Sequence, residues 1–261
     1  MAVNRFAYNG VWSTSYDYYI SKRTKVMPKR RIETHDLTGR NGAWVQDGIY
    51  VGNATITYEG WIVADTHASL RNKINNLTRL MYAQNQIGYS RLSDTYDDDG
   101  YMMAVPIGAP DITYTAHGTA ATLKFTFSAK PEVYLNEGNV WQSFGSNDTI
   151  SFVRDGRGYD TFPLIESTGS GTIRLLSDFP GFSDDVGFTI TVNSDDTIMQ
   201  DLETGSITVA DTGEVAASVV KWASIQTGKI AVPYFKAGCG LYMVTTSGNI
   251  SGRIKPRWYR F

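Results

Sequence analysis

The chain has 261 residues and a formal net charge of −2 at pH 7, so its composition does not favour a dedicated nucleic-acid binder. Hydrophobic residues make up 42% of the chain and charged residues 19%, which excludes a largely disordered protein. A chain of this length forms one large or two ordinary domains, and we expect two.

Cysteine usage and hydropathy indicate where the chain folds. Cys239 is the only cysteine, so no internal disulfide is expected and assembly in a reducing cytoplasm is the simplest interpretation. The first residues lead into no apolar run of the signal-peptide type, and no segment approaches the roughly 20 apolar residues that a bilayer requires. We therefore expect neither export by the usual route nor insertion into a membrane.

The N-terminal tract predicts short strands separated by turns. Residues 5–12 form a strand that contains an Asn9-Gly10 turn, and residues 16–21 form a second short strand. Pro28, with basic residues on both sides, marks a loop or a sheet edge because proline cannot donate to a strand ladder.

A glycine-flanked turn is the first candidate interaction site. Gly39 and Gly42 enclose Arg40 and Asn41 between two β-like segments, and glycine and asparagine tolerate the positive backbone angles of reversals. The pattern predicts a hairpin or loop tip. Trp44 follows directly, and tryptophan is enriched in protein interfaces, although most buried tryptophan belongs to a core. These five residues are our candidate interface.

A strand and an amphipathic helix follow. Residues 50–62 are rich in β-branched and aromatic residues and alternate between apolar and polar from Ala54 onward, which predicts a half-buried strand. Asp65 or Thr66 offers a side-chain oxygen to the first amides of a helix. The apolar positions of this helix share one narrow stripe, and they are Leu70, Ile74, Leu77 and Met81.

The rest of the chain reads as strands and turns. In the first half we expect strands at 88–92, 101–107, 111–115 and 119–128, a polar loop at 94–100, an end of the unit at 129–131 and a linker at 135–139. In the second half we expect strands at 149–154, 163–166, 171–176, 187–193, 197–202, 206–210, 229–232, 241–246 and 249–256. This spacing is typical of a β-sandwich.

No motif for catalysis or metal binding emerges. The three histidines, His35, His67 and His117, stand far apart and lack metal-ligand spacing. The acidic run from Asp97 to Gly100 fails the calcium-loop pattern because proline occupies the position of the bidentate glutamate. We expect no cofactor, no metal and no enzyme activity.

Charged residues are unevenly distributed, and we interpret most of them as solvated surface rather than as docking sites. Basic residues crowd the early chain, at Lys22, Arg23, Lys25, Lys29, Arg30, Arg31 and Arg40. Acidic residues come later, at Asp94, Asp97, Asp98, Asp99, Asp184, Asp185, Asp195 and Asp196. We interpret the pair Asp195-Asp196 as turn chemistry.

The order of these features resembles the distal tail protein (Dit) family of long-tailed phages of the siphovirus type. The resemblance rests on the residues 6–10, 37–42, the helix after Trp61, and the segments 125–131 and 254–258. In the second half, residues 201–204, 233–240 and 247–248 also resemble the second domain of that family.

The resemblance implies a mainly β protein. It would have an N-terminal β-sandwich with one flanking α-helix, like that of a tail tube, in residues 1–136, and a C-terminal galectin-like β-sandwich in residues 137–261. The implied function is a structural hub in the virion, made in the host cytoplasm and forming a hexameric homo-oligomer ring. Its implied partners are the tail tube protein, a tail-tip protein and a receptor-binding protein, with DNA passing through the ring without specific binding.

Two alternatives stay open. The first is that the second half is a carbohydrate-binding or receptor-binding module of the tail tip, although no sugar-binding residue set is recognisable. A glycan hydrolase is the least favoured, because a pair of catalytic carboxylates has no recognisable sequence signature here.

Overall fold

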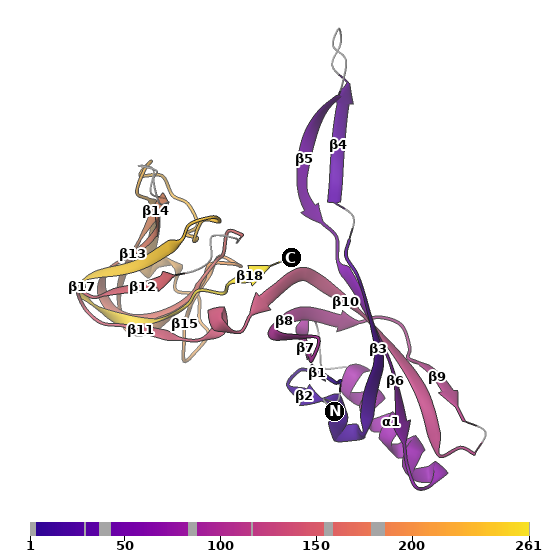
Figure 1. Ribbon diagram of the computed structural model, residues 1–261. Helices are drawn as coiled ribbons and strands as arrows, with labels where there is room; N and C mark the ends of the chain where they lie inside the picture. Colours follow the sequence, from indigo (N-terminus) through magenta and orange to yellow (C-terminus); the bar gives the residue numbers. More distant parts are fainter. Residues whose placement is uncertain are drawn as a thin grey trace. The chain divides into compact units, whose positions relative to one another are not determined.

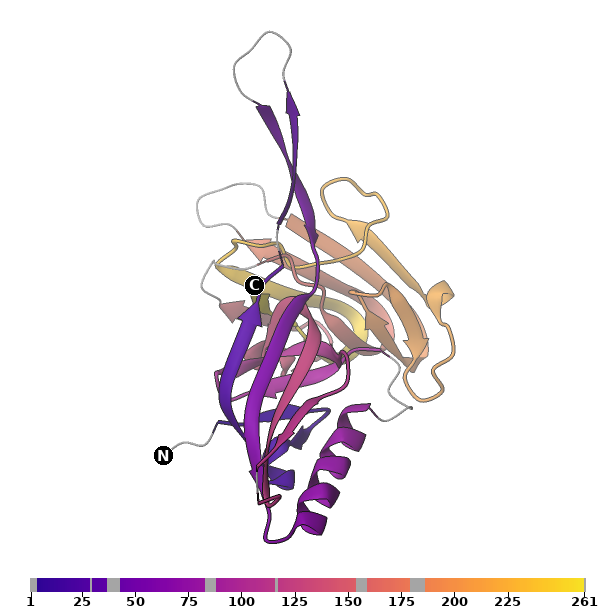
Figure 2. The ribbon, with the colours of Figure 1, turned by 90° about the vertical axis from the view of Figure 1, so that its right-hand side faces the viewer.

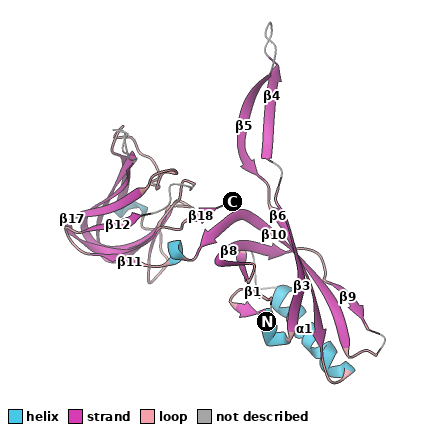
Figure 3. Cartoon of the chain, viewed as in Figure 1, coloured by secondary structure: helices cyan, strands magenta, loops and turns pink. Residues whose placement is uncertain are grey.

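The computed structural model describes residues 4–28, 30–36, 43–82, 88–115, 117–153, 159–178 and 186–260, with only the backbone for the strands at 30–36 and 43–51. The chain forms two compact units, Met1–Val133 and Tyr134–Arg260 (Figure 1). Both units are built from antiparallel strands, and one α-helix occurs in the described residues (Figure 3). The predicted mainly β class with a single flanking helix is confirmed.

Unit 1 contains one large sheet and a separate two-stranded ribbon. The large sheet has the order β2-β1-β7-β8-β10-β6-β3, and β9 also pairs with β10. Its strands are β1 (Phe6–Tyr8), β2 (Val11–Trp12), β3 (Tyr18–Val26), β6 (Ala54–Val63), β7 (Ser90–Asp94), β8 (Asp97–Pro106), β9 (Asp111–Tyr114) and β10 (Ala120–Leu135), and a 3-10 turn, η1, covers Ser13–Tyr16. The ribbon consists of β4 (Arg30–Asp36) and β5 (Ala43–Val51).

The first hairpin forms as its sequence predicts. Asn9 and Gly10 have φ angles of 50° and 80°, and Tyr8 pairs with Val11 across the turn. Two residues with positive φ form the kind of turn whose twist matches that of the flanking strands.

The helix α1 (His67–Tyr82) covers one face of the large sheet (Figure 2). Thr66 caps it, because its Oγ1 accepts a hydrogen bond from the Ser69 amide at 3.1 Å. The buried residues of the helix are Leu70, Ile74, Leu77 and Met81, as predicted. They share a core with aromatic side chains of the sheet, namely Phe6, Tyr8, Tyr18, Tyr58, Phe125 and Phe127.

Several predicted boundaries in unit 1 are wrong. Residues 94–100 are not a polar loop: β7 and β8 pair through Asp94 opposite Asp97, so only Thr95 and Tyr96 separate the strands. The last strand of unit 1 does not end at 128, because β10 continues to Leu135. The predicted strand at 50–62 is interrupted at Gly52 and Asn53, between β5 and β6.

Unit 2 is one seven-stranded sheet with the order β11-β17-β13-β14-β15, in which β12 also pairs with β17 and β16 with β14. Its strands are β11 (Gln142–Phe144), β12 (Thr149–Val153), β13 (Leu164–Asp178), β14 (Val186–Asp201), β15 (Ser206–Val209), β16 (Val220–Ser224) and β17 (Leu241–Lys255). Short 3-10 turns, η2 (Glu137–Asn139) and η3 (Ala217–Val219), lie between strands, and β18 (Tyr259–Arg260) pairs with β10.

Three long strands in unit 2 each replace two predicted short ones. The predicted pairs at 163–166 and 171–176, at 187–193 and 197–202, and at 241–246 and 249–256 are single strands, β13, β14 and β17. Each is strongly curved in Figure 1, and the register of β13 against β14 shifts between Ser167 and Gly169. Glycine allows this: Gly169 has a φ of 102°, and a Cβ there would lie 2.2 Å from the Asn249 carbonyl oxygen.

Other expectations for unit 2 also need correction. Asp195 and Asp196 lie inside β14 rather than in a turn, beside the register shift. Residues 229–232 are not a strand, whereas β11 and β16 were not predicted. The two compact units meet between Val133 and Tyr134, inside β10, close to the predicted boundary at residue 136.

Candidate functional site

One of the five predicted interface residues, Trp44, belongs to the β4/β5 ribbon. Gly39, Arg40, Asn41 and Gly42 lie outside the described residues, and Trp44 lies in β5 with its backbone opposite His35. The strands on either side of the turn pair antiparallel, with Asp36 opposite Ala43. In Figure 2 the ribbon stands clear of the large sheet, and its strands continue β3 and β6 across short breaks.

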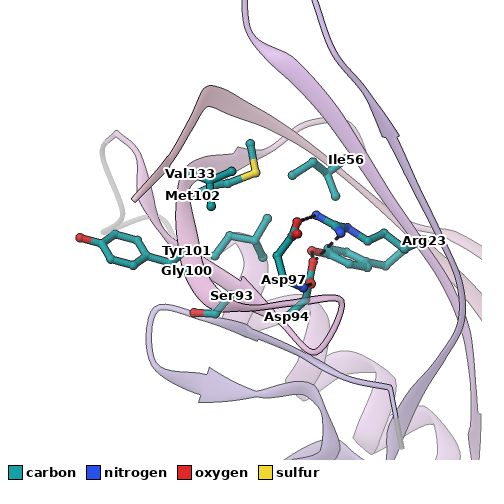
Figure 4. A pocket seen from close by; sticks show the side chains of 11 residues that line it. Arg23, Ile56, Ser93, Asp94, Asp97, Gly100, Tyr101, Met102 and Val133 are labelled. Carbon is teal, nitrogen blue, oxygen red and sulfur yellow. Dashed lines mark hydrogen bonds and ion pairs between the residues drawn. The ribbon is translucent and has the colours of Figure 1, made fainter. Parts of the chain in front are cut away.

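A buried ionic cluster lies near the base of this ribbon (Figure 4). Arg23 on β3 places its Nε 3.1 Å from Asp94 Oδ2 and an Nη atom 2.7 Å from Asp97 Oδ2. Its side chain is 12% exposed and that of Asp94 is 4% exposed. The Tyr58 hydroxyl on β6 donates to the same Asp94 oxygen. The cluster therefore connects β3 and β6 to the β7–β8 turn.

Backbone amides fix the orientation of the acidic half of the cluster. Asp94 Oδ1 accepts hydrogen bonds from the amides of Tyr96 at 2.9 Å and Asp97 at 3.0 Å. An aspartate that bonds to amides two and three residues ahead closes a tight turn, which explains why this polar stretch forms a hairpin instead of a loop.

Burial and neighbouring charge set the protonation of the cluster. Burial alone would lower the pKa of the Arg23 guanidinium, but Asp94 and Asp97 raise that pKa above its ordinary value. Burial and then the Asp94 carboxylate raise the pKa of the Tyr58 phenol well above its ordinary range. Arg23 therefore stays charged and Tyr58 stays a neutral donor at physiological pH.

The cavity beside the cluster is too small for a substrate. Its volume is about 10 Å³, and its lining includes Arg23, Tyr58 and Met102. A single buried water needs a volume of this order. The cluster therefore stabilises the fold rather than binding a substrate. The interpretation of Asp94 and Asp97 as solvated acids is wrong, because both carboxylates pair with Arg23. No local sequence pattern indicates that Arg23 lies against them.

The face of the sheet opposite α1 carries a row of alternating charges. Lys22 on β3, Glu59 on β6, Lys124 on β10 and Asp111 on β9 are successive register partners. Lys22 and Glu59 lie 3.9 Å apart, as do Lys124 and Asp111. Cross-strand pairs of opposite charge stabilise the register of a sheet.

An aromatic pair adjoins this row of charges. The rings of Tyr19 and Trp61 lie 5.0 Å apart, and Trp61 is 47% exposed. The face therefore combines paired charges with exposed aromatic area, which is a composition that interfaces use.

A partly exposed aromatic and charged cluster lies around Trp141 in unit 2. The Arg253 guanidinium lies 4.6 Å and the Lys255 ammonium 4.8 Å from the centre of the Trp141 ring. Arg253 also forms a 2.7 Å ion pair with Glu166. Trp258, in contrast, is 5% exposed and belongs to the core of unit 2.

The remaining chemistry-bearing residues form no metal or catalytic group. No set of three or more metal-ligating side chains comes together among the described residues. The ring of His67 lies 6.3 Å from that of Tyr114, and His117 is exposed. Cys239 is buried in the core of unit 2, as expected of a small apolar residue. No helix in the described part of the chain is long and apolar enough to cross a bilayer.

Fold and surfaces together define a mainly β protein of two compact units, whose described residues offer extended faces and one small cavity beside Arg23. No protein-family model and no curated protein matches its sequence significantly. Among solved structures, the crystal structure of the SPP1 Dit (gp 19.1) protein matches with a TM-score of 0.62 and 12% sequence identity. The match covers 97% of this chain and 98% of that one. That protein is described as a paradigm of the hub adsorption apparatus in phages infecting Gram-positive bacteria. The predicted resemblance to the distal tail protein family is thus confirmed for the fold.

Proposed function

We propose that the protein is a structural hub at the distal end of a phage tail and has no enzyme activity. The observation that carries the proposal is the fold shared with the SPP1 Dit protein across both units. In this proposal residues 1–136 assemble into a hexameric ring that continues the tail tube, and residues 137–261 form a galectin-like domain outside it. The partners are then the tail tube protein, a tail-tip protein and a receptor-binding protein.

The surfaces of unit 1 suit such assembly. A cyclic oligomer needs two different patches that meet on neighbouring copies. Unit 1 offers a two-stranded ribbon, an exposed helix face and a charged sheet face, and its one described cavity holds no more than a water molecule. Extended faces without a pocket are typical of assembly rather than of catalysis.

The test is the mass and shape of the purified full-length chain. Mass photometry and negative-stain electron microscopy are expected to show rings with the mass of six copies. A monomer at all concentrations, including after addition of the tail tube protein, would contradict the proposal.

The Trp141 cluster favours a second candidate function, carbohydrate binding by unit 2. A partly exposed indole can stack on a sugar ring, and the neighbouring Arg253–Glu166 pair can bond its hydroxyls. A glycan array with the full-length chain and its Trp141→Ala variant tests this function. Glycan binding that disappears in the variant supports it, and an array without any signal contradicts it.

A further inference from the structure

The outer face of α1 has an unusual composition for an exposed helix surface. After the first turn of the helix, its exposed residues are Arg71, Asn72, Asn75, Asn76 and Arg79. Arg71, Asn75 and Arg79 recur every four residues and therefore lie along one line of the helix. No acidic residue occurs between His67 and Tyr82, so this line is cationic with no compensating charge on the helix.

The arginines of this line differ from the lysine beside them. Lys73 is engaged within unit 1, since its Nζ lies 2.7 Å from Asp17 Oδ2 and 3.2 Å from the Val63 carbonyl oxygen. Arg71 and Arg79 form no ion pair or hydrogen bond with another described residue. Two guanidiniums, which prefer bidentate contact with carboxylates, therefore remain available to a partner.

The asparagines argue for a contact as well. Asparagine is among the weaker helix formers, and each one costs about 0.5 kcal/mol relative to alanine in a helix interior. Three of them lie on the exposed face, where packing within unit 1 does not require them. Their side chains carry both donors and acceptors, which suits a polar protein interface.

Unit 1 also carries a complementary acidic surface. Asp98 and Asp99 lie at the start of β8 and are exposed. They directly follow the turn that Asp94 closes and that Arg23 holds to β3. The acidic pair is therefore presented from a rigid support rather than from a loose loop.

We propose that the Arg71–Asn75–Arg79 line of one copy docks on Asp98 and Asp99 of the neighbouring copy. This contact rests on the proposed ring, and it supplies the two unlike patches that a closed ring requires. The chain thereby carries both halves of the interface on unit 1, and a second copy of this chain is the occupant of the helix face.

A charge-swap experiment tests the contact. The R71E/R79E variant and the D98K/D99K variant are each expected to shift the ring to monomers, with at least a tenfold higher concentration needed for assembly. The quadruple variant R71E/R79E/D98K/D99K is expected to form rings again, because the charges are exchanged across the interface. The R174E/K221E variant, which reverses two exposed charges in unit 2, is the control and should assemble normally.

A second variant separates interface from fold. Replacing Asn72, Asn75 and Asn76 by alanine is expected to raise the melting temperature of the subunit and to weaken assembly. A purely structural role of the helix would raise the melting temperature and leave assembly unchanged, which would overturn the inference.

The outcomes distinguish this contact from the ring itself. If the wild type forms rings and both double variants, R71E/R79E and D98K/D99K, also form them, the contact is overturned. The proposed ring is then unaffected. A wild-type chain that never forms rings overturns both proposals. If each double variant loses the ring and the quadruple variant forms it again, the contact is established.

Discussion

The two units use charge in different ways. In unit 1, Arg23 and Asp94 are buried in the sheet and share the Tyr58 hydroxyl. In unit 2, the Arg253–Glu166 pair lies at the surface, with the Arg253 side chain 45% exposed. A buried pair is costly to break, whereas an exposed one contributes little. The difference teaches that unit 1 buries an ionic cluster that fixes its geometry near the ribbon, whereas this pair of unit 2 remains in contact with solvent.

The largest expected effect is on unit 1. Asp94→Ala leaves Arg23 buried without its main partner and removes the acceptor of Tyr58, so we expect a loss of about 3–5 kcal/mol in the free energy of unfolding. Urea unfolding measures the loss, and hydrogen exchange shows whether it occurs in unit 1. Glu166→Gln in unit 2 is the matched control, with an expected loss of about 0–1 kcal/mol. Equal losses in the two variants would remove the contrast between the units.

The next effect sharpens the role of strand curvature in unit 2. Gly169→Ala places a Cβ 2.2 Å from the Asn249 carbonyl oxygen at a φ of 102°, and we expect a loss of about 3 kcal/mol or more. Gly205→Ala is the control, since Gly205 has a φ of 71° but no atom within 4 Å of the added Cβ. Its loss should be about 1–2 kcal/mol, from backbone strain alone. If the Gly169 variant is as stable as the Gly205 variant, the close approach of the Asn249 backbone does not require glycine at position 169.

A smaller effect depends on pH. Burial would raise the pKa of Asp201, but hydrogen bonds and charge from Arg257, with the amides of Glu203 and Thr204, lower that pKa below its ordinary value. A lowered folded-state pKa stabilises the protein above the unfolded-state pKa of about 3.9, and this stability is lost as the pH falls through the folded-state pKa.

Arg257→Gln should weaken this dependence. We expect the wild type to lose up to about 1 kcal/mol more than the variant when the pH is lowered from about 5 to about 2. Urea midpoints at several pH values measure the difference. Parallel pH profiles for the two proteins would show that Arg257 does not set the titration of Asp201.

The smallest effect on stability is expected at the ribbon. Arg40→Glu should change the free energy of unfolding by less than about 0.5 kcal/mol, because an isolated surface change seldom does more. We nevertheless expect the variant to weaken ring formation, since the sequence predicts that Arg40 belongs to the candidate interface. Light scattering compares the oligomer masses, and Trp44→Ala provides a second substitution at the same site. An unchanged mass in both variants counts against the candidate interface.

Features encoded within a few residues could be predicted from the sequence. The stripe from Leu70 to Met81 repeats with the period of a helix, and exactly that stripe is buried. Asn9 and Gly10 form the predicted turn because asparagine tolerates a positive φ angle and glycine, which lacks a Cβ, adopts one without strain. The alternation from Ala54 onward likewise gives the alternating burial of β6.

Features that depend on distant residues could not be predicted. A glycine within a strand looks the same in sequence as a glycine that ends one, so Gly169 in β13 and Gly248 in β17 each predict a break. In β14, Asp195 and Asp196 do the same because aspartate is common in turns. Asp94 appeared solvated because its partner Arg23 is distant in sequence and meets it only through the order of strands in the sheet. For the same reason the Trp141 cluster could not be recognised, since Arg253 reaches Trp141 from another strand.

The strands β13, β14 and β17 continue without interruption through the curved region of the sheet near Gly169, and this continuity affects how unit 2 unfolds. Each of these strands contributes to the same core on both sides of the bend, as Ile165 and Ile173 of β13 do. Local fluctuation in one half of the sheet is then transmitted along the backbone to the other half. Unit 2 should therefore melt as a single cooperative element, and its slowest-exchanging amides should lie on either side of Gly169 and Gly248.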